Sequence, residues 1–281
     1  MNAAGTPDVQ RQIEKKTNLQ AAMNLAELTF HSIVRDVRKA HRNAIVGLLL
    51  AILQAVTFVA IFYILMQLMG MRHSAIRGDY MIYIMSGIFF FLSHNKALGA
   101  VVSASTLSNT ILAHSPLNSI VMIASAALGA LYIQTLALLT ILFLYHVLIT
   151  PVVIDDPTGA LIAYLLAWIS GVANGLVLLA LTPWFPNAAK VIRTIYMRAN
   201  MITSGKMFLG NMLPGYLLQV FSWNPLFHTI DQGRGYIFIN YNPYNSSIWY
   251  PVWWTLIFIV IGMMAEFYTR QYASQSWNAG R

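Results

Sequence analysis

Six long apolar stretches constrain this chain more than any other feature of its sequence. They cover about 44–68, 80–101, 119–149, 160–181, 191–213 and 249–268, with polar connections between them. A helix of about 20 apolar residues crosses the hydrocarbon core of a bilayer. The sequence therefore predicts an all-α polytopic membrane protein with six transmembrane helices. The second and fifth stretches are the least regular, because His94, Asn95 and Lys96 interrupt the second, and Arg198 and Lys206 interrupt the fifth.

The composition excludes a soluble domain. Charged residues make up 9% of the 281 residues and apolar residues 58%, whereas a soluble domain carries about 25% charged residues. The net charge of +8 does not indicate a nucleic-acid partner, because basic residues at cytoplasmic helix ends explain the excess. The chain has no cysteine, which excludes disulfides, thiolate metal sites and thiol nucleophiles.

The basic residues predict which side of the membrane each loop faces, because cytoplasmic loops carry more Lys and Arg. With a cytoplasmic N-terminus, the inside holds Arg11, Lys15, Lys16, Arg35, Arg38, Lys39, Arg42, Lys96, Lys190, Arg193, Arg270 and Arg281. The outside then holds Arg72, Arg77 and Arg234, with Lys206 at its edge. We therefore expect both termini in the cytoplasm. The polar N-terminus lacks an early apolar core, so no cleaved signal peptide is expected.

Three segments outside these stretches have patterns of their own. In the cytoplasmic segment 1–43, residues 18–42 predict an amphipathic helix lying in the membrane surface. Residues 105–114 predict a short cytoplasmic helix. Residues 205–240 hold two apolar pieces too short to span, separated by Trp223-Asn224-Pro225, and predict two re-entrant helices before the last span. Residues 44–281 then form a single transmembrane domain.

The sequence carries no motif for energy conversion or catalysis. The nearest approach to a phosphate-binding loop is Gly205-Lys206, but Met207 follows where Ser or Thr is needed. The first five stretches have no Asp or Glu in their interiors, so no buried carboxylate relay is expected. HExxH and GxSxG motifs are also absent. We therefore expect no catalytic residue, no metal site and no cofactor bound by the chain itself, which needs an outside source of energy.

The segment from Trp223 to Arg234 reads WNPLFHTIDQGR and lies just before the last apolar stretch. It resembles the permease subunits of type-two ABC exporters for capsular polysaccharide and O-antigen, which share the Asn-Pro-Leu, His, acidic and Arg pattern. That family also has a basic interfacial helix before span one, a coupling helix between spans two and three, and two re-entrant helices before span six. The resemblance covers about residues 25–270 and rests on the order of these features.

The resemblance implies a homodimer in the bacterial inner membrane, driven by two copies of a separate ATP-binding subunit. The pair would export a lipid-linked polysaccharide, and a periplasmic adaptor or co-polymerase and an outer-membrane exporter would continue the path. ATP would act only through the partner subunit. The coupling contact with that subunit is expected at Ser105, Asn109, Leu112 and His114.

Six residues are candidates for lining the conduit: Arg198, Lys206, Trp223, His228, Asp231 and Arg234. The last three recur every three residues and share one helix face, so they either line the outer exit or tie the helix to its neighbours through charged hydrogen bonds. A cation within a membrane span is costly. The two cations of the fifth stretch therefore either attract an acidic glycan or lipid phosphate, or extend to the interfaces. Trp223 belongs either to an aromatic belt or to a sugar-stacking surface.

Three other functions stay open on sequence alone. A type-two ABC permease for teichoic acid, a lipid or a drug would share every feature above. An ion-coupled secondary transporter would need buried acids or an internal repeat, and neither is evident. A membrane-embedded glycosyl-transfer enzyme would need a cluster of catalytic acids, and the sequence offers almost none.

Overall fold

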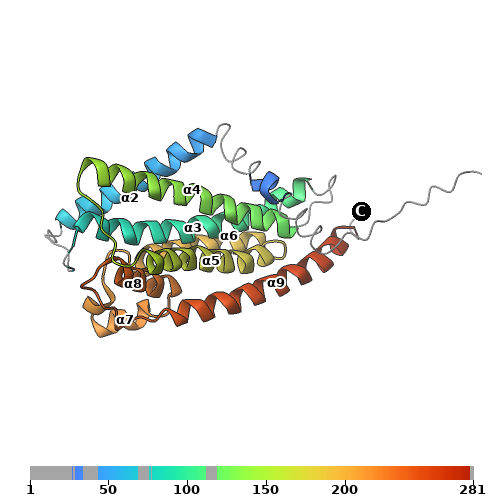
Figure 1. Cartoon of the computed structure of the whole chain (residues 1–281). Helices are drawn as coiled ribbons and strands as arrows, with labels where there is room; N and C mark the ends of the chain where they lie inside the picture. The colour runs from blue at the N-terminus through green and yellow to red at the C-terminus, as the bar shows by residue number, and fades with distance from the viewer. Residues whose placement is uncertain are drawn as a thin grey trace, which may run out of the picture.

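The structure, a computed structural model, describes residues 27, 29–33, 44–68, 76, 78–111 and 119–278. All regular structure in these ranges is helical (Figure 1). The helices are α2 (Ala44–Leu68), α3 (Tyr80–Ile111), α4 (Ser119–Leu148), α5 (Pro157–Leu181), α6 (Pro186–Thr203), the short 3-10 turn η1 (Gly210–Met212), α7 (Gly215–Phe221), α8 (Pro225–Ile237) and α9 (Trp249–Asn278). The prediction of an all-α chain is therefore confirmed for this part of the protein.

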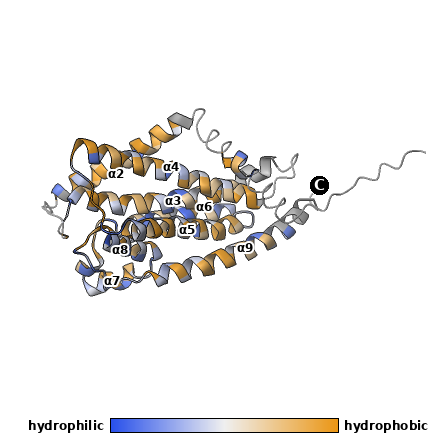
Figure 2. Ribbon diagram, viewed as in Figure 1, coloured by the Kyte–Doolittle hydropathy of each residue, from blue (hydrophilic) through white to orange (hydrophobic). Residues whose placement is uncertain are grey.

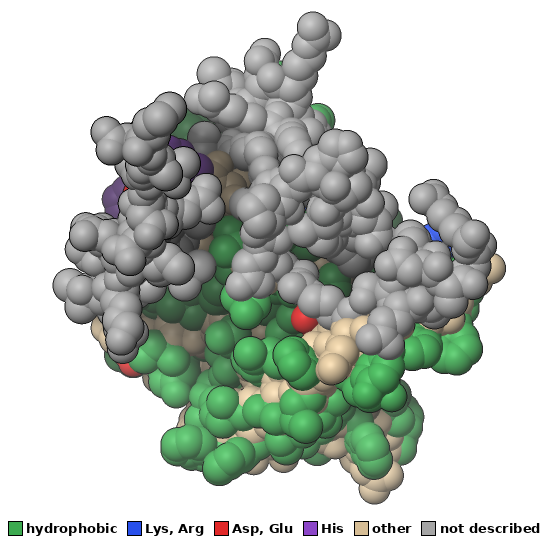
Figure 3. Space-filling model, turned by 90° about the vertical axis from the view of Figure 1, so that its right-hand side faces the viewer, with side chains coloured by type: hydrophobic (Ala, Val, Ile, Leu, Met, Phe, Trp, Pro, Cys, Tyr) green, Lys and Arg blue, Asp and Glu red, His purple; other side chains and the backbone are tan. Residues whose placement is uncertain are grey.

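Five of the helices are long and apolar enough to cross a membrane, which is consistent with a polytopic membrane protein. Their candidate spans are Val46–Leu65, Tyr80–Ala104, Ile120–Leu148, Pro157–Leu181 and Trp249–Thr269. Apolar colour follows these helices along their length (Figure 2). Figure 3 views the bundle from its right-hand end in Figure 1, where apolar side chains make up most of the described surface.

The expected fifth stretch, 191–213, differs from the helix found there. α6 begins at Pro186 and ends at Thr203. It contains Lys190, Arg193 and Arg198, so it is not among the five helices that are apolar enough to span. Its end is fixed by Gly205, whose φ of +69° is the left-handed conformation in which glycine commonly terminates a helix. The six predicted spans are thus five apolar helices and one shorter, polar helix.

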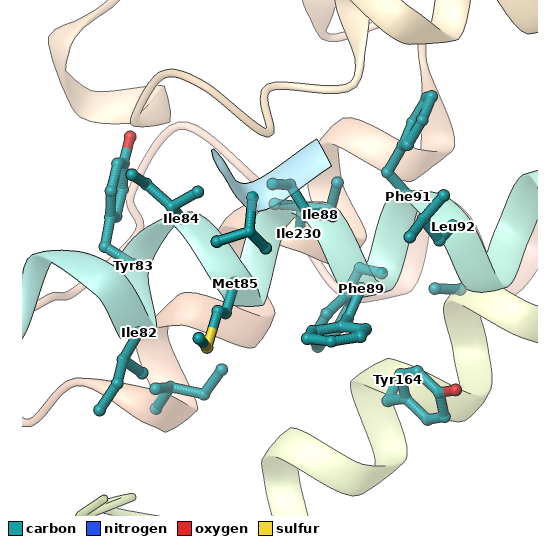
Figure 4. Packing of buried hydrophobic residues seen from close by; sticks show 14 of the residues in the cluster. Ile82, Tyr83, Ile84, Met85, Ile88, Phe89, Phe91, Leu92, Tyr164 and Ile230 are labelled. Carbon is teal, nitrogen blue, oxygen red and sulfur yellow. The ribbon is translucent and has the colours of Figure 1, made fainter. Parts of the chain in front are cut away.

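α3 lies at the centre of the bundle and organises the core. In its candidate span 83% of the residues are buried, against 17% in the spans of α2 and α9. Figure 4 shows the packing of α3 side chains such as Ile88 and Phe89 with Tyr164 of α5 and Ile230 of α8. α3 buries polar side chains such as Ser93 and His94 as well as apolar ones, and it packs against α2, α4, α5, α6 and α8.

α5 packs closely against α3 and runs parallel to α9. A Cβ on Gly171 would lie 2.2 Å from the carbonyl oxygen of His94, so only glycine permits this approach of α5 to α3. Along the α5–α9 pair, Trp254 Nε1 donates to Asn174 Oδ1 and Thr269 Oγ1 donates to the Ala180 carbonyl. In these two contacts the residue numbers of α5 and α9 increase in the same direction, so the two helices run parallel. The chain must therefore cross back along the length of the bundle between the end of α5 and the start of α9.

Two predicted cytoplasmic features lie largely outside the described ranges. Of the interfacial helix at 18–42, Glu27 and residues 29–33 are described, and they are helical. The expected coupling segment, 105–114, begins within α3, which continues without interruption to Ile111. Ser105 and Asn109 belong to this helical end, whereas Leu112 and His114 lie outside the described residues.

Candidate functional site

α8 carries three of the predicted site residues and is one of the most buried elements of the chain. Its start is defined locally: Pro225 occupies the first turn, and the side chain of the N-cap residue Asn224 accepts a hydrogen bond from the backbone N–H of Leu226 at 2.9 Å. His228, Asp231 and Arg234 follow at three-residue spacing, and all three are buried. We call these three residues the α8 cluster.

Asp231 is the acceptor of the α8 cluster. Its side chain is 2% exposed. It accepts hydrogen bonds from the backbone N–H of Gly210 at 2.9 Å, from Ser246 Oγ at 2.7 Å and from the hydroxyl of Tyr241. Burial and the nearby Asp231 charge raise the pKa of Tyr241 above its ordinary value, so this phenol stays protonated and keeps donating. One carboxylate therefore joins the loop before α7 to the loop after α8.

Arg234 is the donor of the α8 cluster and is fully buried. Its Nη1 donates to the carbonyl oxygens of Gly205 at 2.9 Å and Phe208 at 2.7 Å, and its Nη2 donates to that of Lys206. The guanidinium also lies 4.2 Å from the centre of the Tyr83 ring of α3. Among the described residues, no ion pair joins Arg234 to Asp231. Each charge instead has its own set of loop partners, as a buried charge requires, although Arg234 Nε has none among the described residues.

His228 is held as a neutral ring. Its Nδ1 accepts from the backbone N–H of Ser247 at 3.0 Å, so its Nε2 carries the proton and donates to the carbonyl oxygen of Ser222 at 2.8 Å. Burial lowers the pKa of His228, which favours the same neutral form. The ring also contacts Tyr250 at the start of α9, with 4.7 Å between ring centres. His228 therefore connects the α7–α8 turn to the entrance of α9.

The six predicted conduit residues fall into two groups. The α8 cluster and Lys206 are buried in this chain, whereas Arg198 of α6 and Trp223 of the α7–α8 turn are exposed, Trp223 to 76%. The contacts of the α8 cluster are those of a scaffold that ties α8 to the loops around it. Of the six candidates, Arg198 and Trp223 are the two whose side chains lie at the surface of the single chain.

Among the described residues, buried Lys206 has no acidic partner. Its side chain is 3% exposed. Its Nζ lies 3.6 Å from the centre of the Phe91 ring and 4.9 Å from that of Phe62. Among the described residues, Nζ has no hydrogen-bond partner. Loss of water around the amine lowers the pKa of Lys206 to about 7.

A buried polar network holds α6 against the rest of the bundle, and sequence reasoning did not anticipate it. His94 of α3 bonds through Nδ1 to Ser170 Oγ at 2.9 Å and through Nε2 to the hydroxyl of Tyr196 at 3.0 Å. That hydroxyl accepts from Asn174 Nδ2 at 2.8 Å, and Asn174 Oδ1 in turn accepts from Trp254. The available signal was the polar interruption of the second apolar stretch. Through Tyr196, the network holds a helix of low hydropathy against α3 and α5.

No site for a metal ion is found among the described residues, since no three His, Asp or Glu side chains gather in them. When the chain is compared with protein-family models and with curated proteins, none matches. Any assignment of function therefore rests on the residues and contacts described above.

Proposed function

We propose that this chain is the membrane permease of an ATP-driven exporter that moves a lipid-linked polysaccharide, capsular in the first instance, across the bacterial inner membrane. It would work as a homodimer with two copies of a separate ATP-binding subunit and with both termini in the cytoplasm. A periplasmic adaptor or co-polymerase and an outer-membrane exporter would receive the glycan. The chain itself would hydrolyse nothing.

The observation that carries this proposal is the uncovered face of α6. In α6, Ala189 and Asn200 are the buried residues. Its exposed residues mix apolar side chains, such as Val191 and Ile195, with Lys190, Thr194 and Arg198. A bare cation facing hydrocarbon is costly. Such a face is better suited to a polar conduit closed by a second copy of the chain.

The path of the chain also favours α6 as a sixth span. Since α5 and α9 run parallel, the connection between them must cross back over the length of the bundle. α6 has 18 residues, which corresponds to about 27 Å of helix and so to roughly the thickness of the hydrocarbon core. We infer that α6 crosses the membrane beside the conduit and that the short α7 and α8 form the re-entrant pair.

The proposed coupling contact lies at the far end of α3 from the α8 cluster. Tyr83, near the start of α3, donates to the carbonyl oxygen of Met207 at 2.9 Å, whereas α3 ends at Ile111. A helix of this length spans about 45 Å. An ATPase that pushes on 105–114 would therefore act on the opposite side of the membrane from α8, with α3 as the rigid link.

Co-purification tests the proposal directly. After mild extraction from the native membrane, we expect a Walker-motif ATPase to accompany the chain in equal amount, as measured by quantitative mass spectrometry. Replacing Asn109 and His114 by alanine is expected to abolish that pairing. Replacing Tyr244, which is 75% exposed at the other end of the bundle, is expected to leave it intact. Purification of the wild-type chain without any ATPase would refute the permease assignment.

Arg198 provides a test of the conduit itself. Arg198→Gln is expected to lower glycan export about tenfold, because a charged hydrogen bond to an anionic group contributes about 1.5 kcal/mol or more. Thermal stability should not change, since Arg198 is exposed. The conservative variant Arg198→Lys should retain most of the export. Equal export by the wild type and the Gln variant would remove Arg198 from the conduit.

A further inference from the structure

α2 is attached to the bundle by one narrow face. In its candidate span 17% of the residues are buried. The buried ones form a stripe of Ala51, Ala55, Val59 and Phe62. Among the described residues, no hydrogen bond joins an α2 side chain to another helix, since the one recorded for Thr57 goes to Leu53 of α2 itself. α2 therefore depends on apolar and aromatic contact for its position.

The stripe ends at the amine of Lys206. Phe62 of α2 and Phe91 of α3 lie on two sides of Lys206 Nζ, at 4.9 Å and 3.6 Å from ring centre to nitrogen. We call these two rings and the amine the Lys206 cage. α2 supplies one wall of the cage and α3 the other, so the amine sits in the seam between the two helices.

The main chain at Lys206 is attached to α3 and α8, and among the described residues it makes no hydrogen bond to α2. Arg234 donates to the carbonyl oxygen of Lys206, and Tyr83 donates to that of Met207. A Cβ on Gly87 of α3 would lie 2.5 Å from the Lys206 carbonyl oxygen, so the loop packs directly on α3. The loop is thus attached to α3 and α8, and α2 is the wall of the Lys206 cage to which it makes no hydrogen bond among the described residues.

The surroundings of the cage supply no counter-ion. Among the described residues, the packed elements carry other charged or titratable groups, but none of them hydrogen-bonds to Lys206 Nζ. They are Tyr63 of α2, Tyr80, Tyr83, His94 and Lys96 of α3, and His228, Asp231, Arg234 and Tyr236 of α8. α2 has no Asp, Glu, Lys, Arg or His between Ala44 and Leu68. Asp231 is occupied by hydrogen bonds from Gly210, Tyr241 and Ser246. Cation–π attraction to the two rings compensates in part for the hydration that an ammonium loses on burial. The neutral amine loses less on burial and fits this environment better.

We propose that the Lys206 cage is a protonation-dependent latch, in which the uncharged amine lets α2 close on α3 and the ammonium favours an open seam where it reaches water or an anionic group. This latch does not depend on what the protein transports. Its consequence is that the position of α2 follows the protonation of one buried lysine.

The sign of the pH dependence follows from the two states. In the closed state burial lowers the pKa of Lys206 from 10.5 to about 7, whereas in the open state the amine has its ordinary pKa. Between these values the open state binds the proton and the closed state does not. Raising the pH across this window therefore favours closure, by up to about tenfold in the ratio of closed to open molecules per pH unit.

Distance measurement on the full chain tests the latch. The chain has no cysteine, so Leu65→Cys on α2 and Ile239→Cys after α8, both exposed, can carry spin labels in lipid nanodiscs. In the wild-type background we expect the closed fraction to rise between about pH 7 and about pH 9.5, following the lysine titration. In Lys206→Met the closed distance should dominate at every pH, and the melting temperature should rise, because the replacement is apolar and of similar size.

A second variant separates the latch from simple packing. Phe91→Leu keeps an apolar wall but removes the nearer ring, so the ammonium is tolerated less well. We expect a larger open fraction than wild type at about pH 7, with the pH dependence preserved. A wild-type distance distribution that does not change with pH would overturn the latch. A Lys206→Met protein that melts earlier and opens more would overturn it as well, since the amine would then be a stabilising contact.

Discussion

Replacing Arg234 by methionine is expected to cost about 3–5 kcal/mol of folding stability, the loss typical when one partner of a buried charged network is removed. The carbonyl oxygens of Gly205, Lys206 and Phe208 would all lose the guanidinium, although that of Gly205 would keep the backbone N–H of Phe208 as a donor. Each acceptor left buried without a partner is destabilising in itself. Thermal unfolding of the purified protein in detergent measures the effect, and a sharp fall in the yield of folded protein should accompany it.

Two further variants define what Arg234 contributes. Arg234→Lys keeps the positive charge but offers a single ammonium in place of the planar fork, so we expect an intermediate loss. Asn240→Ala, at an exposed position shortly after α8, should change the unfolding temperature little. If Arg234→Met unfolded at the wild-type temperature, the guanidinium would not be the tie that holds the loop before α7 to α8.

Replacing Gly171 by alanine is expected to destabilise the protein by about 1–3 kcal/mol through overpacking. The new Cβ would lie 2.2 Å from the carbonyl oxygen of His94 and 3.0 Å from its Cα. These are backbone atoms of the central helix and cannot rotate away. The clash would separate α3 from α5 where His94 reaches Ser170 and Tyr196, so α6 should lose its attachment as well. Thermal unfolding, together with protease access to α6, checks both effects.

Gly215→Ala is the matched control for Gly171→Ala. No atom lies within 4 Å of a Cβ built at Gly215 in α7, so only the helix propensity changes there. Gly215 is the first residue of α7, so the gain should be smaller than the about 0.8–1.0 kcal/mol by which alanine exceeds glycine in a helix interior. The two substitutions should therefore shift stability in opposite directions. Stabilisation by both would mean that α3 and α5 tolerate a wider spacing than the one described.

Local sequence predicts the apolar helices well and their ends less well. The stretch predicted at 44–68 is α2, and 119–149 is α4 to within one residue. α3 continues beyond 101 to Ile111 and α9 beyond 268 to Asn278. Hydropathy marks the part of a helix that suits hydrocarbon, whereas the helix continues until a capping or breaking residue stops it. α5 shows the reverse case, because Asp156 caps it and starts it at Pro157, ahead of the apolar stretch.

The sequence placed the α8 cluster on one short helix but did not specify its environment. Three-residue spacing placed His228, Asp231 and Arg234 on one face of a short helix, and the structure has them there. The sequence did not specify whether that face contacts a conduit or a loop. The partners of Arg234 are backbone carbonyl oxygens. Because every residue has such a group, no side-chain pattern in the sequence marks which of them will act as acceptors.

The sequence by itself determined which segments are apolar helices, where Asn224 and Pro225 start α8, and that the chain lacks a nucleotide-binding loop. These properties depend on neighbours within a few residues. Only the tertiary structure decided that Lys206 meets Phe62 and Phe91, and that His94 meets Tyr196. These partners are about a hundred residues or more apart along the chain and meet only because α3 packs at the centre. Whether a polar group stays charged, neutral or exposed depends on the groups that surround it in space, and local sequence does not specify them.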